Sequence, residues 1–216
     1  AMSHARVWLN GQEVGYWPYG DNSFHFDVTP YLKAEGTNTL AVRLEKQHES
    51  SRWYPGAGLY RNVHLVINED AYVPTWGTQL TTPEVNRDFA KVNLKTSLAF
   101  PKGKKIEDYR IVTELKDATG KVVAKAEKQG THYDGKGFEQ DFVVDKPALW
   151  SPDSPALYTA ESKIYEGNTL KDEYTTRFGI RSIEFIPDKG FFLTGEHPVF
   201  KGVCNHHDLG PLGGIA

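Results

Sequence analysis

The chain has 216 residues, of which 39% are hydrophobic and 25% are charged, and its formal net charge is −3. This length suits one or two domains with a real hydrophobic core. A nearly neutral chain without a basic block gives no electrostatic reason to expect nucleic-acid binding. No apolar run approaches the ~20 residues that a membrane-spanning helix needs, so we expect no membrane association either.

The single cysteine, Cys204, excludes a disulfide within the chain and a cysteine-based metal site. We expect it to behave as a small buried hydrophobic residue. The aromatic residues favour strands, and aromatic rings can also stack on sugars. We expect most of them to pack in the core, including four of the tryptophans: Trp8, Trp17, Trp76 and Trp150.

A period-two alternation of apolar and polar residues runs along nearly the whole chain, which predicts β-strands and no helix. In the first 70 residues this pattern predicts strands at residues 6–9, 13–16, 23–28, 39–45 and 63–67. Between the first two strands, Asn10 and Gly11 tolerate the positive φ angles of a type I′ turn. They therefore predict a hairpin.

Residues 76–181 contain about seven predicted strands, with turns every 8–12 residues as in an immunoglobulin-like sandwich. The clearest strand covers residues 90–100, and a turn is predicted at residues 117–120. Further strands are predicted at residues 109–115, 122–127, 137–144, 157–165 and 170–178. The sequence has no Cys–Trp–Cys pattern, which excludes an antibody-type domain.

From residue 183 to residue 216 the pattern of predicted strands and turns differs from that of the preceding residues. Residues 183–186 and 190–193 flank a Pro-Asp-Lys turn and predict a hairpin, and residues 199–203 predict one more strand. So short a segment cannot form a core of its own. Because the chain also starts inside a strand, we expect both ends to be truncated. The edge strands would then be exposed and could pair with a second copy in a homo-oligomer.

Three groups of segments carry a family resemblance. They are residues 7–11, 24–29, 40–43 and 51–63; residues 149–158 and 177–181; and residues 200–208. In this order they resemble the β-galactosidase branch of glycoside hydrolase family 2. The resemblance implies an all-β fold with half of a jelly-roll sugar-binding domain in residues 1–70 and an immunoglobulin-like β-sandwich in residues 71–182. It further implies that residues 183–216 are the start of a truncated (β/α)₈ catalytic barrel.

The same resemblance implies a retaining exo-glycosidase that acts on terminal β-galactosides. Such an enzyme needs two carboxyl groups about 5 Å apart, and in this family both are glutamates on later barrel strands. We therefore expect this chain to be an inactive, non-catalytic fragment that needs no metal or cofactor. Its full-length form would bind a β-galactoside or oligosaccharide, and the family's habits suggest a periplasmic or secreted bacterial protein.

Three other functions fit parts of the sequence. A free-standing carbohydrate-binding module would show a row of exposed aromatic side chains on one sheet face. Specificity for β-mannosides or β-glucuronides would follow from differences within the barrel. A structural or adhesion protein of the immunoglobulin type would leave residues 204–214 without a role.

The resemblance also suggests which residues touch substrate. His206, His207 and Asp208 follow the predicted first barrel strand, whose carboxyl end faces the sugar. Imidazole and carboxylate groups form good hydrogen bonds to sugar hydroxyls. Arg52 and Trp53 lie on a loop that, in the family, leans toward the active site, where Arg52 would bind a sugar hydroxyl or stack in the pocket. For Trp53 a role as a core or interdomain anchor stays open beside substrate contact. A metal cluster at residues 206–208 is disfavoured, because adjacent strand residues point to opposite faces.

The chain departs from the family pattern in two places. Cys204 and Asn205 stand where the commoner galactosidase pattern has Asn-Arg, and Ser51 stands where some relatives carry a sugar-contacting aspartate. Neither Glu184 nor Glu196 has a carboxylate partner at a defined spacing. Both are therefore expected at the surface, and residues 68–69 are expected to form a solvated turn.

Overall fold

The computed structural model describes residues 1–45, 58–68, 70–132 and 137–204. Within these ranges the chain is all-β, with two short 3₁₀ turns at Thr29–Tyr31 and Ile106–Asp108. In the described part of the chain, no helix is long and apolar enough to cross a membrane. The internal contacts define two units, Ala1–Leu65 with Lys201–Ala216, and Val66–Phe200. The domain division at residues 70 and 182 stays a prediction.

The first unit is built on a three-stranded antiparallel sheet with the order β2-β1-β3. Its strands are β1 (Ala5–Leu9), β2 (Gln12–Trp17) and β3 (Leu40–Arg43). Asn10 and Gly11 join β1 to β2 with φ angles of 54° and 83°, so the predicted hairpin is confirmed. The Asn10 side-chain oxygen also accepts a hydrogen bond from the backbone N–H of Thr39 at 3.0 Å, just before β3.

Two segments with strand-like alternation form no ladder. In residues 23–28, Phe24 stacks on Trp17 with ring centroids 5.8 Å apart, so side chains pack together there without backbone pairing. Residues 63–67 stay unpaired and exposed. The prediction of strands in these two segments is wrong. Alternation reports which side chains face inward, whereas a strand also needs a neighbouring backbone to bond.

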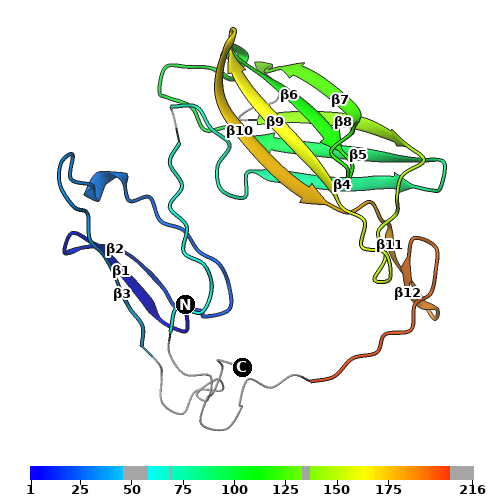
Figure 1. Cartoon of the computed structure of the whole chain (residues 1–216), viewed down its shortest axis with the longest axis horizontal. Coiled ribbons are helices and arrows are strands. Elements are labelled where there is room, and N and C mark those ends of the chain that lie inside the picture. Colours follow the sequence, from blue (N-terminus) through cyan, green and yellow to red (C-terminus); the bar gives the residue numbers. More distant parts are fainter. Residues whose placement is uncertain (46–57, 69, 133–136, 205–216) are drawn as a thin grey trace. The chain divides into compact units, whose positions relative to one another are not determined.

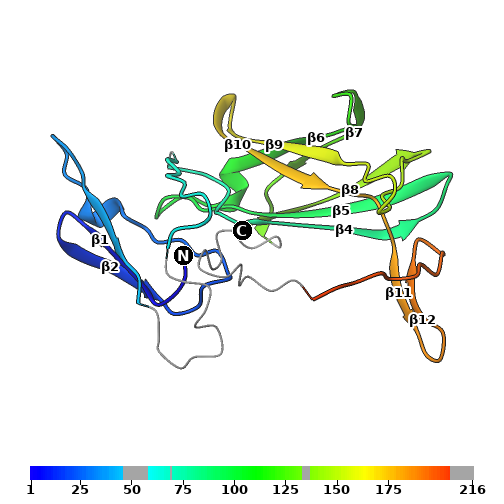
Figure 2. The same ribbon diagram turned by 60° about the horizontal axis from the view of Figure 1, so that its bottom comes forward.

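The second unit contains a β-sandwich of two antiparallel sheets, seen as two layers in Figure 2. One sheet has the order β4-β5-β8 and the other β10-β9-β6-β7 (Figure 1). The strands are β4 (Thr78–Val85), β5 (Phe89–Ser97), β6 (Tyr109–Lys116), β7 (Val122–Gln129), β8 (Gly137–Asp145), β9 (Tyr158–Glu166) and β10 (Thr169–Phe178). This arrangement confirms the predicted immunoglobulin-like sandwich.

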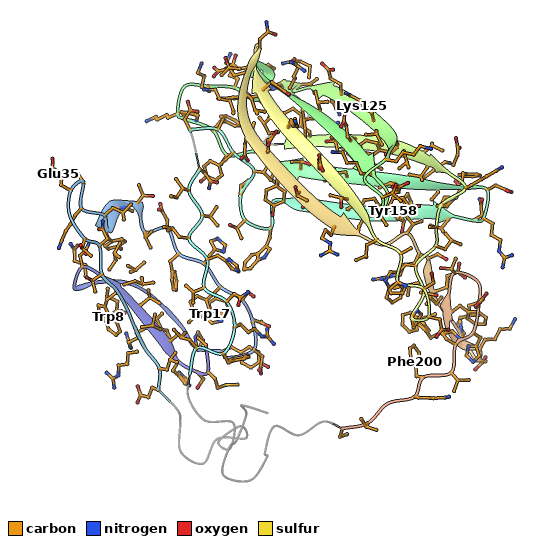
Figure 3. The ribbon with its side chains drawn as sticks, in the orientation of Figure 1. Trp8, Trp17, Glu35, Lys125, Tyr158 and Phe200 are labelled. Carbon is orange, nitrogen blue, oxygen red and sulfur yellow. The ribbon has the colours of Figure 1, made fainter. Side chains whose placement is uncertain are left out.

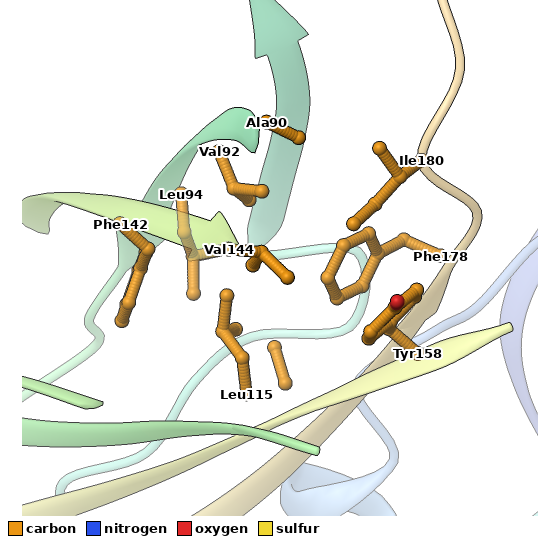
Figure 4. Packing of buried hydrophobic residues seen from close by; sticks show 10 residues of the cluster. Ala90, Val92, Leu94, Leu115, Phe142, Val144, Tyr158, Phe178 and Ile180 are labelled. Atoms are coloured by element: carbon orange, nitrogen blue, oxygen red, sulfur yellow. The ribbon is translucent and has the colours of Figure 1, made fainter. Parts of the chain in front are cut away.

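The sandwich core consists of two apolar clusters with a polar layer between them. The first cluster is shown in Figure 4 and contains Ala90, Val92, Leu94, Leu115, Phe142, Val144, Tyr158, Ala160, Phe178 and Ile180. The second cluster contains Ala71, Val73, Leu98, Ile106, Tyr109, Ile111, Phe138 and Ile164. Between them β5, β6, β8 and β9 each contribute one buried polar residue, and we refer to these residues as the polar belt: Thr96, Thr113, Gln140 and Ser162.

Hydrogen bonds join three members of the polar belt across the two sheets. Thr113 Oγ1 donates to Gln140 Oε1 at 2.7 Å, and because it has one proton it accepts from Ser162 Oγ at 2.9 Å. Gln140 Nε2 donates to the carbonyl oxygen of Ala126 at 3.2 Å. Since Thr113 and Gln140 belong to opposite sheets, the belt links the two layers at a defined register.

A hairpin follows the sandwich. It consists of β11 (Ile183–Ile186) and β12 (Gly190–Leu193), which pair antiparallel with Ile183 opposite Leu193. The predicted hairpin at this point is confirmed.

Candidate functional site

The five residues predicted to contact substrate lie outside the residues that the structure describes: Arg52, Trp53, His206, His207 and Asp208. Their roles stay predictions. The structure does describe the segment that leads to residues 206–208, together with the carboxyl groups and hollows of the sandwich. These features decide what chemistry the described part of the chain can perform.

The segment before residues 206–208 forms no strand and is strongly exposed. Phe200, which is labelled in Figure 3, is 73% exposed. Its ring packs on that of Phe191 of β12, with centroids 4.9 Å apart. Val203 is 88% exposed, and Cys204 is exposed as well. The prediction that Cys204 is buried is therefore wrong. Burial of a barrel strand requires flanking strands, and the described residues supply none at this point.

The described carboxyl groups with a displaced pKa are all displaced downward: Asp27, Glu114, Asp117 and Glu166. Hydrogen bonds to neighbouring side chains are the first cause in each case, as from Lys125 to Glu114 and from Lys104 to Glu166. A glycosidase acid must instead hold its proton near neutral pH, which requires a raised pKa. These four groups are therefore unsuited to general-acid catalysis.

An open hollow of about 330 Å³ lies where β6, β9 and β10 meet the turn after β6. In it Lys116 pairs with Glu161. The Asp117 carboxylate accepts hydrogen bonds from the backbone N–H groups of Thr119 and Lys121, which confirms the predicted turn. Hydrogen bonding to Thr119 lowers the pKa of Asp117. Since Glu161 is already paired and Asp117 caps the turn, these carboxylates serve the fold.

Glu184 and Glu196, which were expected at the surface, are both exposed. Glu184 lies on β11 opposite Phe192, and the backbone of Glu196 bonds that of Leu193 in a turn. Among the described residues, no group of three or more His, Cys, Asp or Glu side chains is placed to hold a metal ion.

Ion pairs cover the outer faces of both sandwich sheets. They include Arg110–Glu127, Lys125–Glu114, Lys163–Glu173, Lys91–Glu84 and Lys95–Glu139 (Lys125 is labelled in Figure 3). Tyr165, on the four-stranded sheet, is covered by the Arg110 guanidinium 4.4 Å from the ring centroid. The outer faces of the two described sandwich sheets therefore lack the aromatic row that a carbohydrate-binding module would present.

The tryptophans fill different environments. Trp8, Trp17 and Trp150 are half-buried, in line with packing roles. Trp76 differs, because it is 60% exposed and its φ is 59°, an uncommon conformation for a bulky residue.

Trp150 joins two segments that carry the family resemblance, residues 149–158 and residues 177–181. Its backbone N–H donates to the carbonyl of Ile180 at 2.9 Å. Its indole fills the space beside Gly179, where an added Cβ would lie 2.8 Å from the ring. The Arg181 guanidinium lies 4.4 Å from the ring centroid. Residues 149–158 and 177–181 thus meet in one packed unit at the exit of the sandwich.

At the sandwich entry, a charge network anchors the segment before β4. Lys171 binds both Asp70 at 3.3 Å and Glu166 at 3.1 Å, and Glu166 also binds Lys104. Next to this network, the Asp172 carboxylate accepts from the backbone N–H of Val73 at 2.7 Å. The entry segment is therefore held to β9 and β10 by several charged groups.

Glu166→Gln is expected to lower the melting temperature of the sandwich at neutral pH, and by a smaller amount as the pH falls below about 4.5. Hydrogen bonds from Lys104 and then Lys171 hold the pKa of Glu166 below its ordinary 4.5. Because the folded-state pKa is depressed, its stabilisation is present above about pH 4.5 and is lost as the pH falls through the folded-state value. Thermal unfolding of both proteins across this pH range measures the effect, which should shrink with added salt. A difference that persists unchanged at pH 3 would contradict it.

Comparison with known proteins shows which family and which relatives this chain is similar to. Residues 77–181 match the family model described as glycosyl hydrolases family 2. A β-galactosidase of Bacteroides ovatus is 41% identical over 97% of this chain, which spans 25% of that protein. A putative β-glucuronidase of Formosa agariphila is 39% identical over 98% of the chain, which spans 20% of it.

Among solved structures, a glycosyl hydrolase family 2 member from Bacteroides cellulosilyticus matches all of this chain with a TM-score of 0.90 at 33% identity. The chain covers 28% of that structure. It thus spans about a quarter of the length of these relatives.

Proposed function

This chain belongs to glycosyl hydrolases family 2 through the domain in residues 77–181, and we propose that it supplies the non-catalytic β-sandwich part of a retaining exo-glycosidase for terminal β-galactosides. The observation that carries the proposal is the 41% identity to the B. ovatus β-galactosidase over 97% of the chain. Residues 1–70 would belong to a jelly-roll sugar-binding domain, residues 71–182 to a spacer sandwich, and residues 183–216 to the entry of the catalytic barrel.

The described strands support a spacer role. All strand ladders in the described residues are antiparallel. A (β/α)₈ barrel needs parallel strands with helices between them, and its catalytic groups come from several strand ends. We propose that the paired acids lie elsewhere in the longer protein. Its active site would be completed by Arg52, Trp53 and residues 206–208 of this chain.

β-Glucuronidase specificity is the second candidate, because the F. agariphila relative is 39% identical over 98% of the chain. The two substrates differ at two positions of the sugar: the orientation of the C4 hydroxyl and the group carried at C5. A glucuronide carries a carboxylate that needs a charge-assisted partner, whereas a galactoside carries a neutral hydroxymethyl group. The residues that make this distinction would lie mainly in the barrel.

The purified 216-residue chain is expected to hydrolyse neither a nitrophenyl β-galactoside nor the corresponding β-glucuronide above the buffer rate. Under this proposal, the opposed carboxyl pair that splits a glycosidic bond lies outside this chain. Calorimetry with galactose and lactose should also show no binding. Hydrolysis at an enzyme-like rate would overturn the proposal, and clear sugar binding without hydrolysis would favour the carbohydrate-binding module.

Two matched chimeras test the positive half of the proposal. In one, this chain replaces the aligned residues of the B. ovatus β-galactosidase; in the other, it replaces those of the F. agariphila putative β-glucuronidase. The first chimera is expected to fold and keep at least about a tenth of its parent's kcat/KM, a loss of about 1.4 kcal/mol in transition-state binding. The second is expected to lose more. If only the glucuronidase chimera is active, the galactoside assignment is wrong.

A further inference from the structure

Asn10 and Gly11, in the turn between β1 and β2, form the one Asn-Gly pair of the chain. Asparagine deamidates most readily before glycine, because glycine has no Cβ to hinder attack by its backbone nitrogen on the asparagine side-chain carbonyl carbon. The new C–N bond closes a succinimide ring and expels ammonia. Water then opens the ring and leaves aspartate or isoaspartate, so the two steps need no reactant other than water.

Three hydrogen bonds fix the Asn10 carboxamide to segments outside the turn. Its Nδ2 donates to the carbonyl oxygen of Tyr31 at 2.9 Å and to Asn38 Oδ1 at 2.7 Å. Its Oδ1 accepts from the backbone N–H of Thr39 at 3.0 Å. Ring closure must bring the side-chain carbonyl carbon onto the Gly11 nitrogen, a movement that these bonds oppose. Deamidation of the folded chain therefore requires a local opening in which they break.

The product of the reaction cannot rebuild the same contacts. Deamidation replaces Nδ2, which is a donor, by a carboxylate oxygen, which at neutral pH only accepts. That oxygen faces two acceptors, the Tyr31 carbonyl and Asn38 Oδ1. Asn38 cannot reverse its amide to supply a donor without losing the bond that its Oδ1 accepts from the Lys33 N–H at 2.9 Å. Isoaspartate departs further, because it adds a methylene to the backbone of the turn.

We propose that Asn10 is a deamidation site gated by the fold. The bonds to Tyr31, Asn38 and Thr39 suppress the reaction, a local opening permits it, and the product keeps the site open. Each modified chain is then a permanent record of an opening at the edge of the first sheet. The inference rests on described residues of the first unit and does not depend on the proposed enzymatic role.

Peptide mapping by mass spectrometry in mildly alkaline buffer measures the rate of deamidation. We expect Asn10 to react at least about tenfold more slowly in the folded chain than in urea, where no fold restrains the side chain. Gly11→Ala, compared in urea so that the positive φ of Gly11 has no influence, should slow the reaction by about tenfold as well. That loss identifies the backbone nitrogen of residue 11 as the attacking group.

Asn38→Ala tests the gate, because it removes one acceptor of the Asn10 carboxamide. The variant is expected to deamidate at Asn10 at least about threefold faster than the parent under native conditions, and at the parent's rate in urea. Asn22→Ala is the matched control, because it makes the same substitution at an exposed position of the same unit outside these hydrogen bonds. Its rate should equal that of the parent in both solutions.

Asn10→Asp tests the consequence, because it copies the aspartate product of the reaction. The backbone N–H groups of residues 10 and 39, which bond across the turn, should lose hydrogen-exchange protection, whereas that of the buried Ile111 in the sandwich should keep it. Part of the loss should be reversed at pH 3, because a carboxyl group below its ordinary pKa of about 3.9 carries a proton that it can donate. A general loss of packing would not respond to pH in this way.

Three outcomes overturn the proposal. They are equal rates of deamidation in the folded chain and in urea, equal rates for Asn38→Ala and Asn22→Ala under native conditions, and unchanged protection of residues 10 and 39 in Asn10→Asp. The first would mean that the turn reacts without opening, and the third would mean that the sheet tolerates the product.

Discussion

Replacing Gly130 by alanine is expected to lower the free energy of unfolding of the sandwich by about 3 kcal/mol or more, and its melting temperature by about 10 °C. A Cβ built on Gly130 would lie 2.0 Å from the backbone carbonyl oxygen of Ile106. That oxygen cannot swing aside as the tip of a flexible side chain can. The chain is held on both sides, because Ile106 is buried in the second apolar cluster and the Gly130 N–H donates to the carbonyl of Tyr109 at 2.9 Å.

Gly202→Ala is the matched control. A Cβ added there meets no atom within 4 Å, and Gly202 is exposed. Its substitution should therefore change the free energy of unfolding by less than about 0.5 kcal/mol. Scanning calorimetry of the three proteins, with near-ultraviolet circular dichroism to follow the sandwich, gives the comparison. A Gly130→Ala protein that melts with the parent would mean that the 106–130 contact is looser than the structure describes.

The sandwich was predictable from sequence because its strands alternate between a less exposed and a more exposed face, and β5, β6, β8 and β9 bury the inner one. In β6, every second residue from Tyr109 to Leu115 is fully buried, which is the period-two signal itself. The prediction failed at residues 63–67, where β-prone apolar residues are frequent but no described strand pairs with the segment. Alternation therefore predicts which face of a strand points inward, but it gives no information on whether a neighbouring strand is there to pair with.

The candidate site was predictable only through family resemblance. His206 and Asp208 have no local partner in the sequence that would define a reaction, since their meaning depends on neighbouring barrel strands. Cys204 shows a different limit, because the usual burial of free cysteines predicted a buried side chain and the structure exposes it. The entry network around Lys171 was also missed, because Asp70 and Lys171 are 101 residues apart and only the fold brings them together.

The polar belt was equally hidden, although its members follow the alternation. Thr96 of β5 occupies an inward position between the buried Leu94 and Leu98, of which Leu98 follows the strand, and Thr113 does so between Ile111 and Leu115 on β6. Taken alone, each of these polar residues only interrupts the apolar face of its predicted strand. Only the pairing of the sheets shows that these residues lie at one level and that Thr113, Gln140 and Ser162 are joined by hydrogen bonds, whereas the buried Thr96 Oγ1 has no hydrogen-bond partner among the described residues.

Thr113→Val is expected to lower the free energy of unfolding of the sandwich by about 2–4 kcal/mol, although it hardly changes the side-chain volume. Gln140 Oε1 loses its donor and Ser162 Oγ loses its acceptor, and both side chains are buried. Each buried polar group left unpaired costs about 1–3 kcal/mol. The exposed Thr175 of β10 is the control, and Thr175→Val should change the free energy of unfolding by less than about 0.5 kcal/mol.

Combining Thr113→Val with Gln140→Leu and Ser162→Ala is expected to recover most of that loss, because no polar side chain of the bonded group then remains unpaired. Chemical denaturation of the single, paired and triple variants gives the coupling energies directly. If the free energy of unfolding of the triple variant returns to within about 1 kcal/mol of the parent value, the hydrogen bonds of the polar belt add little net stability. The role of the belt is then to fix which positions of the two sheets face each other. A triple variant as unstable as Thr113→Val alone would instead assign the belt's hydrogen bonds a large net contribution. In the first case, the triple variant should also lose hydrogen-exchange protection at the mid-strand positions, since its two layers could slide without breaking a polar contact.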